Sequence, residues 1–357
     1  MRIKNINDLN KLILNRFVDE DIEIDCDYFF KRNLLILVFK HSIGRMTKGK
    51  KVIFNYDKSR NLFSHSRKIQ NFQIITLCNI YGKGYGSLFQ NHEDQWFEIT
   101  TESKINRSVG LGIPFSGQDS ELPLLKKQLS NIKTCNFSNV LILTSGKLDL
   151  LEKRIKEWGI SIDNLRILKF TPKNAKEMIL YKTGDFKPQI SAKKNILFNA
   201  LETDIKIIAH SRILFQNNIV DELNSSFFEV ATPRISFKTK KTKLNFLDIG
   251  FHTSSNSYQP NFTFSAEFIG SNHYKYFKLG NPYLDGGCNI FSENIKISPY
   301  DERYDWAESE DVAMCKRIDS EGYFIDRLNN IEAFTQTSKL SKSLKARVFS
   351  KIYDIIS

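Results

Sequence analysis

The feature that most constrains the fold is an alternation of apolar runs with amphipathic helical patterns across residues 109–215. Apolar runs at 109–115, 139–146 and 165–170 predict strands, and the run at 204–215 predicts a fourth strand with a polar end. Strands that alternate with helices pair in parallel and are covered by helices on both faces. The sequence therefore predicts an α/β fold built on a mostly parallel sheet. The helical patterns lie at 122–132, 148–158 and 193–202.

The first hundred residues have a different texture. A short helical pattern at 1–18 precedes β-branched and aromatic runs between Ile22 and Thr100, separated by Gly, Asn, Lys and Ser. This pattern predicts a smaller, antiparallel β-rich domain. The polar stretch from Thr101 to Arg107 makes a boundary. We therefore expect a β-rich N-terminal domain at 1–106, an α/β domain at 107–336 and a basic amphipathic helix at 337–357.

The charge balance points to an anionic partner. Lys and Arg number 52 against 40 Asp and Glu, a formal net charge of +12, which suits nucleic acid, a phosphorylated substrate or a membrane surface. Five widely spaced cysteines form no C-x-x-C pair, which favours a reducing cytosol. The longest apolar run, 34–39, is far short of the roughly 20 residues of a spanning helix. We expect a cytoplasmic protein, soluble or peripheral to a membrane.

Two places in the chain carry candidate chemistry. Ligands of parallel sheets bind beyond the carboxyl ends of the strands, which directs attention to 114–117, 144–146 and 210–212. Farther on, a glycine pair permits close approach of backbone to a ligand, and an acidic cluster opens a helical pattern carried by Val312, Cys315 and Ile318. A carboxylate at a helix N-terminus stays ionised and could act as a general base, or it could simply cap the helix. By contrast, the D-x-D at Asp25 lies in an alternating run and is interpreted as structural.

These residues carry a resemblance. The span from about Gly110 to Ala333 resembles the GT-A class of nucleotide-sugar glycosyltransferases, in particular the family-2-like inverting enzymes. The matching blocks are Gly112–Gly117, Lys194-Asn195 with Ala200, His210-Ser211-Arg212, Asp285-Gly286-Gly287 and Trp306–Asp311, of which the last two, in that order, are the most specific.

The resemblance implies transfer of a sugar from a nucleoside-diphosphate sugar to a glycan or glycolipid acceptor. One carboxylate would deprotonate the acceptor hydroxyl while the nucleoside diphosphate leaves the anomeric carbon from the opposite side. Asp311 is the preferred base and Glu310 the second choice, and a retaining outcome stays open. The residues implied in donor binding are Pro114, Phe115, Ser116, Gly117, Lys194, Asn195, His210, Ser211 and Arg212. Those implied in acceptor or sugar binding are Asp285, Gly286, Gly287, Trp306 and Glu308.

The sequence departs from the family at its metal-binding positions. Ser211 stands where the family usually has an acidic ligand, and a hydroxyl binds Mg²⁺ or Mn²⁺ much less well than a carboxylate. Metal dependence is therefore left open. Without a metal, cations of the chain would have to neutralise the departing diphosphate. The candidates are Lys193, Lys194, Arg212 and the basic run Arg234, Lys238, Lys240, Lys241 and Lys243, for which a solvated loop face is the alternative.

The last twenty residues form a basic amphipathic pattern. Four apolar side chains spaced four apart line one helical face from Leu340 to Ile352, with five basic residues and one acidic residue between Ser338 and the chain end. Such a helix can lie on an anionic bilayer, at the inner face of the membrane, or dock on the N-terminal domain or a second subunit.

Two other functions compete with the transferase. A non-catalytic glycan-binding or assembly protein would keep a degenerate glycosyltransferase domain, although the retained pair Glu310-Asp311 weighs against it. A nucleic-acid-binding protein would account for the positive charge, but the basic residues are dispersed and no recognition motif is present. We therefore expect no nucleic-acid partner.

Overall fold

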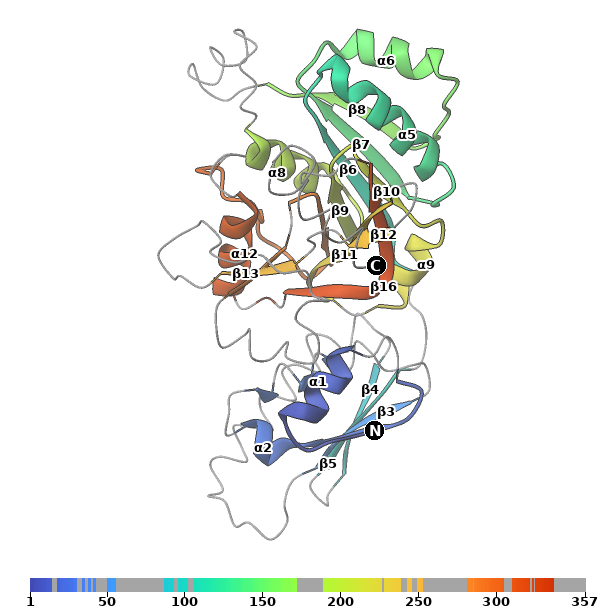
Figure 1. The fold of residues 1–357 in the computed structure, drawn as a ribbon. Helices are drawn as coiled ribbons and strands as arrows, with labels where there is room; N and C mark the ends of the chain where they lie inside the picture. The colour runs from blue at the N-terminus through green and yellow to red at the C-terminus, as the bar shows by residue number, and fades with distance from the viewer. Residues whose placement is uncertain are drawn as a thin grey trace, which may run out of the picture.

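The fold was analysed in a computed structural model, drawn in Figure 1. The structure describes residues 1–14, 18–30, 34–35, 38–39, 41–42, 50–55, 87–92, 96–101, 106–171, 189–226, 228–238, 243–245, 249–252, 281–284, 286–304, 310–321, 323 and 325–336. No helix in this part of the chain is long and apolar enough to cross a bilayer.

A nine-stranded sheet forms the larger part of the molecule. Its strands are β6 (Val109–Phe115), β7 (Asn139–Thr144), β8 (Leu165–Lys169), β9 (Ile205–Ala209), β10 (Ile213–Phe215), β11 (Val230–Lys238), β12 (Lys243–Asn245), β15 (Cys288–Phe291) and β16 (Ile325–Thr335). The order is β10-β16-β11-β15-β9-β6-β7-β8, with β12 paired to β11. The pairings orient β6, β7, β8, β9, β11 and β16 alike and β10, β12 and β15 oppositely. This confirms the predicted mostly parallel sheet.

Helices cover both faces of this sheet, as predicted. They are α5 (Leu122–Ile132), α6 (Leu148–Glu157), α8 (Ile190–Ala200), α9 (Ile219–Asn224) and α12 (Glu310–Ser320), with a 3-10 turn, η1 (Asp119–Glu121), before α5. Apolar side chains of α5, α6 and α9 share one buried cluster with β6, and those of α8 and α12 share a second cluster with β7 and β9. Figure 1 shows α5 and α6 on one side of the sheet and α8 and α12 on the other.

Two glycines in β6 set how close α8 comes to the sheet. A Cβ at Gly112 would lie 2.9 Å from Ile208 Cδ1 and 3.0 Å from Leu197 Cβ, and one at Gly110 would lie 2.5 Å from Thr203 Oγ1. The intervening Leu111 points to the opposite face and is fully buried there. Because strand side chains alternate between faces, this face of β6 is left without side chains where α8 packs.

The predicted strand at 204–215 is two strands. A turn at His210–Arg212 separates them, and β10 pairs with β16 at the far edge of the sheet while β9 lies in its centre. The amide of Ile213 donates to the carbonyl of His210 at 3.0 Å and closes the turn. Hydrophobic periodicity alone does not detect such a turn, because apolar residues flank it on both sides.

The N-terminal part has its own five-stranded sheet, in the order β1-β2-β3-β5-β4, and its own buried cluster. Its antiparallel prediction holds for β3, β5 and β4, but β1, β2 and β3 pair in parallel. The reason is that the run after β2, predicted as strand, begins with a helix, and parallel neighbours require such a crossover. The elements are β1 (Arg2–Ile3), α1 (Ile6–Leu14), β2 (Ile22–Asp25), α2 (Cys26–Phe30), β3 (Lys51–Asn55), β4 (Ser87–His92) and β5 (Trp96–Thr101).

The D-x-D at Asp25 has the structural role expected of it. Asp25 Oδ1 accepts the amide of Tyr28 at 3.1 Å, so this carboxylate caps α2. The two sheets lie on either side of the boundary predicted at residue 106. The division of the chain into domains otherwise stays a prediction.

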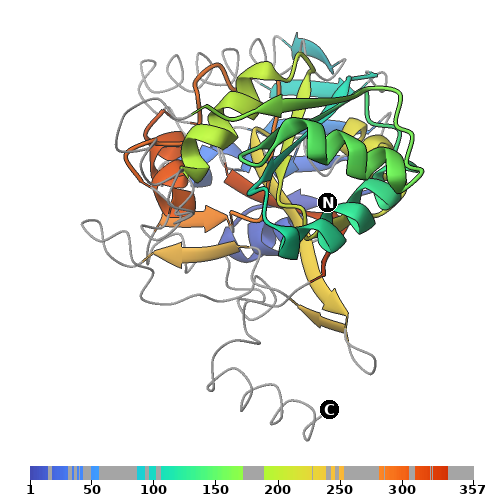
Figure 2. The same ribbon diagram turned by 90° about the horizontal axis from the view of Figure 1, so that it is seen from above.

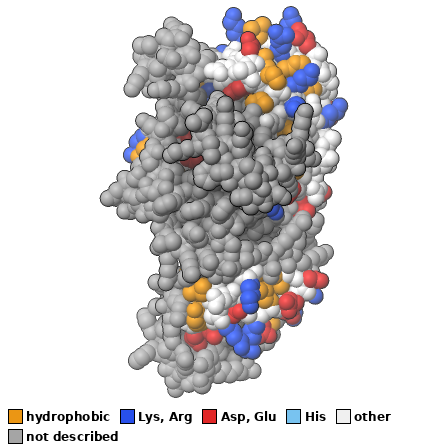
Figure 3. Space-filling model, in the orientation of Figure 1, with side chains coloured by type: hydrophobic (Ala, Val, Ile, Leu, Met, Phe, Trp, Pro, Cys, Tyr) orange, Lys and Arg blue, Asp and Glu red, His pale blue; other side chains and the backbone are white. Residues whose placement is uncertain are grey.

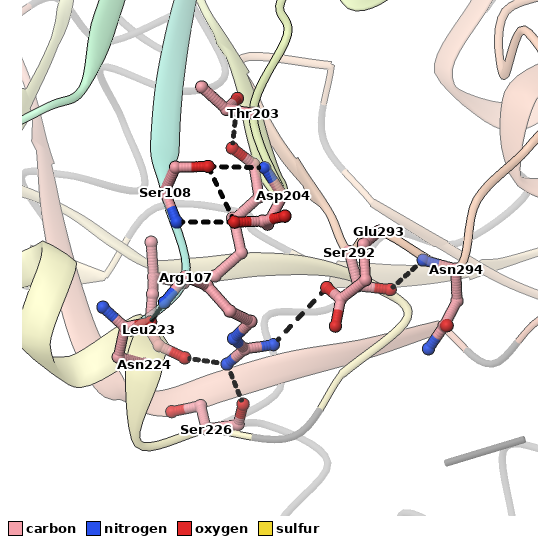
Figure 4. A network of polar contacts seen from close by, with 11 residues as sticks. Arg107, Ser108, Thr203, Asp204, Leu223, Asn224, Ser226, Ser292, Glu293 and Asn294 are labelled. Atoms are coloured by element: carbon pink, nitrogen blue, oxygen red, sulfur yellow. Dashed lines mark hydrogen bonds and ion pairs between the residues drawn. The ribbon is translucent and has the colours of Figure 1, made fainter. Parts of the chain in front are cut away.

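A polar network fastens the amino ends of the central strands (Figure 4). The guanidinium of Arg107 donates to the carbonyls of Leu223 at 2.6 Å and Ser226 at 3.0 Å and lies 3.7 Å from Glu293 Oε2. Ser108 and Asp204, just before β6 and β9, bond each other through side chain and backbone. These groups lie at the end of the sheet opposite to the predicted ligand-binding edge and bind one another there, so we assign them to the scaffold.

The charges of the described surface are mixed. On the face seen in Figure 3, Lys and Arg side chains are interspersed with Asp and Glu over α5, α6 and the N-terminal part. The basic run of residues 234–243 belongs in part to the hairpin of β11 and β12, where Lys238 pairs with Lys243, and Figure 2 shows this hairpin extending away from the sheet.

Candidate active site

Three parallel strands end side by side at the edge that the sequence predicts to bind a ligand. Phe115 of β6 is in register with Thr144 of β7, and β6 pairs in parallel with β9 on its other side. The loops that follow β6 and β7 touch through their backbones. A Cβ at Gly117, whose φ is 86°, would lie 2.3 Å from the amide nitrogen of Gly146. Only glycine fits this approach, and the two loops form one unit.

The four donor candidates of the first loop divide into two pairs. Pro114 and Phe115 are buried within the sheet, whereas Ser116 and Gly117 are half-buried beyond its end. The amide of Ser116 donates to Glu121 Oε2 at 3.2 Å, which fixes the start of the loop. Ser116 and Gly117 are therefore the members of this set that lie where a ligand would approach.

The turn at His210–Arg212 is held rigidly at the same edge. Its three carbonyls accept hydrogen bonds from Gln128 Nε2 at 2.9 Å, from Gln336 Nε2 at 3.2 Å and from the Gln336 amide at 2.8 Å, in chain order. The amide of His210 donates to the carbonyl of Gly287 at 2.9 Å. This bond joins the turn to the predicted glycine pair, which lies some 75 residues farther along the chain.

A buried ion pair brings the glycine pair to the acidic helix start. Lys194 Nζ, on α8, lies 3.3 Å from Glu310 Oε1, on α12, and donates to the carbonyl of Gly286 at 2.8 Å. Lys194 is 0% exposed and Glu310 is 5% exposed. Both charges are therefore matched inside the protein, at a point where three separate segments meet.

Asp311 has a different environment from its neighbour. It is half-buried, its Oδ2 accepts the amide of Gly286 at 3.3 Å, and its Oδ1 accepts the amide of Val312 at 2.9 Å. Two backbone amides and the amino end of α12 thus surround this carboxylate with positive partial charge. Of the two predicted base candidates, Asp311 is thus the more exposed carboxylate, while Glu310 is committed to Lys194.

Asn195 and Tyr300 organise the loop before α12. The Asn195 side chain accepts the amide of Tyr300 at 3.0 Å and donates to its carbonyl at 2.8 Å and to Glu302 Oε1 at 3.1 Å. The hydroxyl of Tyr300 donates to Asn289 Oδ1 at 2.9 Å, and burial raises the pKa of Tyr300 well above its ordinary value. Tyr300 stays neutral, and Lys194 Nζ lies 5.0 Å from its ring centroid.

Among the described residues, the side chain of Lys193 has no such set of partners. It is 2% exposed, and its ammonium lies 5.2 Å from the centroid of the Phe170 ring. Burial lowers the pKa of Lys193 to about 8, partly opposed by the carboxylate of Glu121. Successive helix residues point about 100° apart, so Lys193 and Lys194 face different surroundings.

Several supporting residues were not anticipated from the sequence. Gln128 and Gln336 hold the turn, Tyr300 packs under Lys194, and Lys169 Nζ donates to the carbonyls of Ser145 and Gly146. Lys169 is the polar last residue of an apolar strand at the ligand-binding edge, which was an available signal. The others gave none, because their partners are distant in sequence.

The strand-end residues do not fit a hard divalent cation. The turn offers an imidazole, a hydroxyl and a guanidinium, and no carboxylate, whereas Mg²⁺ and Mn²⁺ prefer carboxylate oxygens. Among the described residues, no group of three or more His, Cys, Asp or Glu side chains could hold a metal ion.

Some predicted residues fall outside the described part of the chain. They are Asp285, Trp306, Glu308, Lys240, Lys241 and the tail at 337–357. Their roles stay predictions. What the structure does join, through the bonds of Gly286 and Gly287, are the turn at 210–212, Lys194 and the acid pair at 310–311.

Comparison with known proteins gives structural matches only. No protein-family model matches the chain, and neither does any characterised protein by sequence. Among solved structures, a mannosyltransferase from Pyrobaculum calidifontis in complex with GDP-Man and Mn²⁺ matches at 12% identity and a TM-score of 0.40, over 66% of this chain and 58% of that one. TarS from S. aureus matches at 8% identity and 0.40, over 64% and 60% of the two chains. The inositol-1-phosphate CTP transferase from T. maritima matches at 13% identity and 0.38, over 70% and 98%.

The mannosyltransferase among these structures belongs to the class that the sequence resembles. At these identities and TM-scores the likeness carries no argument about activity.

Proposed function

We propose that this protein is a glycosyltransferase that moves a sugar from a nucleoside-diphosphate sugar to a glycan or lipid-linked acceptor. The observation that carries the proposal is the hydrogen bond from the Gly286 amide to Asp311, because Gly287 in turn bonds the strand-end turn at His210. A carboxylate, a glycine pair and the end of a central parallel strand are thus held together, which supports a site where a base could act on a ligand bound at the strand ends.

In the proposed reaction Asp311 is the general base. It takes the proton of the acceptor hydroxyl as that oxygen forms a bond to the anomeric carbon, and the bond from this carbon to the diphosphate breaks with its electrons on the leaving group. Inversion at the anomeric carbon follows from a single displacement. Glu310 and Lys194 would keep α12 and Gly286 in register, and act as positioning residues.

Donor contacts are assigned to the half-buried residues of the strand ends. Ser116, Gly117, His210 and Arg212 lie at the edge where ligands of parallel sheets bind. Cations of the chain would balance the charge that develops on the diphosphate. The proposed reaction uses no metal ion, because the turn at 210–212 offers no carboxylate.

The acceptor and the location of the reaction are proposed from the tail. Residues 338–357 carry five basic residues against one acidic residue and an apolar stripe, a composition suited to an anionic membrane surface. We place the enzyme in the cytoplasm, at the inner face of the membrane, where a lipid-linked acceptor would be available.

Nucleotide release tests the proposal. The protein is incubated with UDP-, GDP- and CMP-sugars, with and without EDTA, and free nucleotide is measured over time. Release of one nucleoside diphosphate is expected, because slow hydrolysis occurs even without the natural acceptor. Glycan binding without release from any donor would favour the non-catalytic alternative. The EDTA arm decides whether residues outside the described part supply a metal site.

A further inference from the structure

Adjacent lysines at the start of α8 have opposite situations. Lys194 is neutralised by Glu310 and bonded to Gly286. The side chain of Lys193, buried to nearly the same degree, makes no hydrogen bond and no ion pair with any residue in the described ranges. An ammonium carries three donors, and burying it without acceptors is costly. This ammonium therefore has capacity for an anion that none of the described residues supplies.

The position of Lys193 indicates which anion. Its ammonium packs on the ring of Phe170, whose amide donates to the carbonyl of Thr144 at the end of β7. The carboxylate of Glu121, which holds the amide of Ser116 at the end of β6, also acts electrostatically on this ammonium. The ammonium therefore lies near the segments that follow β6 and β8, beside the carboxyl end of β7.

Glu121 does not use up the charge of Lys193. Its carboxylate already accepts the Ser116 amide, and it lies beyond ion-pair distance of the ammonium, since no such pair occurs among the described residues. Lys169 at the end of β8 is likewise occupied with the carbonyls of Ser145 and Gly146. Of these groups, Lys193 is the one with free donors.

We propose that Lys193 binds the diphosphate group of the nucleotide donor. This rests on the proposed function, which it deepens by naming the residue that balances the leaving group. Lys194, the other lysine of the pair, holds the site together instead. A bound diphosphate supplies the acceptors that the ammonium lacks, and one charge-assisted bond of this kind corresponds to an affinity change of about tenfold to hundredfold.

Calorimetric titration of the full chain tests the assignment. The probes are UDP, GDP, pyrophosphate and uridine, and the variants are Lys193→Met and Lys193→Gln. Lys126→Met, an exposed lysine on α5, is the matched control. Binding of pyrophosphate and of the preferred nucleotide should weaken about tenfold to hundredfold in both Lys193 variants and stay unchanged in the control. Any affinity for uridine should be unaffected, because uridine has no phosphate.

Each other outcome overturns the assignment. Unchanged affinities in the Lys193 variants, an equal loss in Lys126→Met, or no binding by the wild-type protein would each do so. Weaker binding of pyrophosphate alone, with both nucleotides unaffected, would leave a free-anion site unrelated to the donor. Thermal unfolding confirms that the variants fold. If nucleotide binding depends on Lys193 but no sugar nucleotide is turned over, the proposed function fails while this inference stands.

Discussion

Lys194 Nζ and Glu310 Oε1 lie 3.3 Å apart in the interior, and this pair ties α8 to α12. Gly286 lies against both groups, and its carbonyl accepts a hydrogen bond from Lys194 Nζ. The pair therefore connects the sheet-covering helices to the backbone that presents Asp311. We therefore expect loss of this ion pair to affect the stability of the fold first and the proposed reaction second.

Breaking this pair should be costly. Lys194→Met leaves a buried carboxylate without its counter-charge, and we expect the free energy of unfolding to fall by about 3–5 kcal/mol. The double variant Lys194→Met/Glu310→Gln should lose less than the sum of the two single variants, because no unpaired charge remains. Denaturant unfolding measures all three.

The exposed pair Arg154 and Glu157, 3.2 Å apart on α6, is the control for that cycle. Its coupling should be below about 1 kcal/mol. Equal coupling in the two pairs would mean that the Lys194 pair is not buried as described.

Asp311→Asn should remove the proposed base and leave the rest of the site intact. An amide oxygen can still accept one of the two backbone amides that hold Asp311, so folding and donor binding should be nearly unchanged. We expect kcat to fall about 10²- to 10⁴-fold. The measurement is steady-state nucleotide release, with the exposed Asp163→Asn as control. Wild-type turnover in Asp311→Asn would remove it as the base.

Gly286→Ala tests the tight contact at the centre of the site. The added Cβ would lie 2.8 Å from Glu310 Oε1 and 3.1 Å from Lys194 Nζ, so it would push the pair apart. Overpacking of this kind typically costs about 1–3 kcal/mol. Thermal or denaturant unfolding measures the loss, and turnover should fall with it because Asp311 loses its position. An alanine variant as stable as the wild type would contradict the packing described for residue 286.

The buried Lys193 predicts a pH dependence of stability. Its pKa is lowered from 10.5 to about 8 because burial disfavours its charged form. The negative charge of Glu121 opposes this lowering in part. Between these pH values the unfolded chain binds more protons than the folded one, so stability should rise with pH from about 8 to 10.5. The rise, on the order of 3 kcal/mol at most, should be absent in Lys193→Met. An identical pH profile in the variant would show that Lys193 does not titrate abnormally.

Removal of the tail tests the membrane proposal. A chain ending at residue 337 should remain in the supernatant when sedimented with vesicles of anionic phospholipid, whereas the full chain should sediment with them. Neither chain should sediment with zwitterionic vesicles. Equal sedimentation of the two chains would reject the tail as the membrane contact.

The sequence was sufficient to predict the architecture wherever the local hydrophobic pattern agrees with the burial of the same residues in the fold. The helix at 122–132 and the strand at 109–115 were predicted with their bounds because their periodicity and burial coincide. The same reasoning missed the turn at His210, where apolar residues continue on both sides, and the parallel strands near the N-terminus, where aromatic helices resemble strands.

For the site, sequence could indicate segments but not partners. Lys193 and Lys194 are adjacent residues of the same type, and the sequence does not distinguish them. Only the directions of their side chains from α8 show that Lys194 pairs with Glu310 and that Lys193 packs on Phe170. Likewise the acid pair at 310–311 offered two bases, and the choice between them depends on a lysine more than a hundred residues away in the chain.

Gln336, the last described residue of the chain, is fixed against the turn at 210–212. Its amide and side chain bond the carbonyls of Arg212 and Ser211, so the described chain ends beside the predicted ligand-binding edge. A membrane that bound the proposed tail would therefore hold this edge close to its surface. Under the proposed function, an acceptor embedded in that membrane would meet the protein by diffusion in two dimensions.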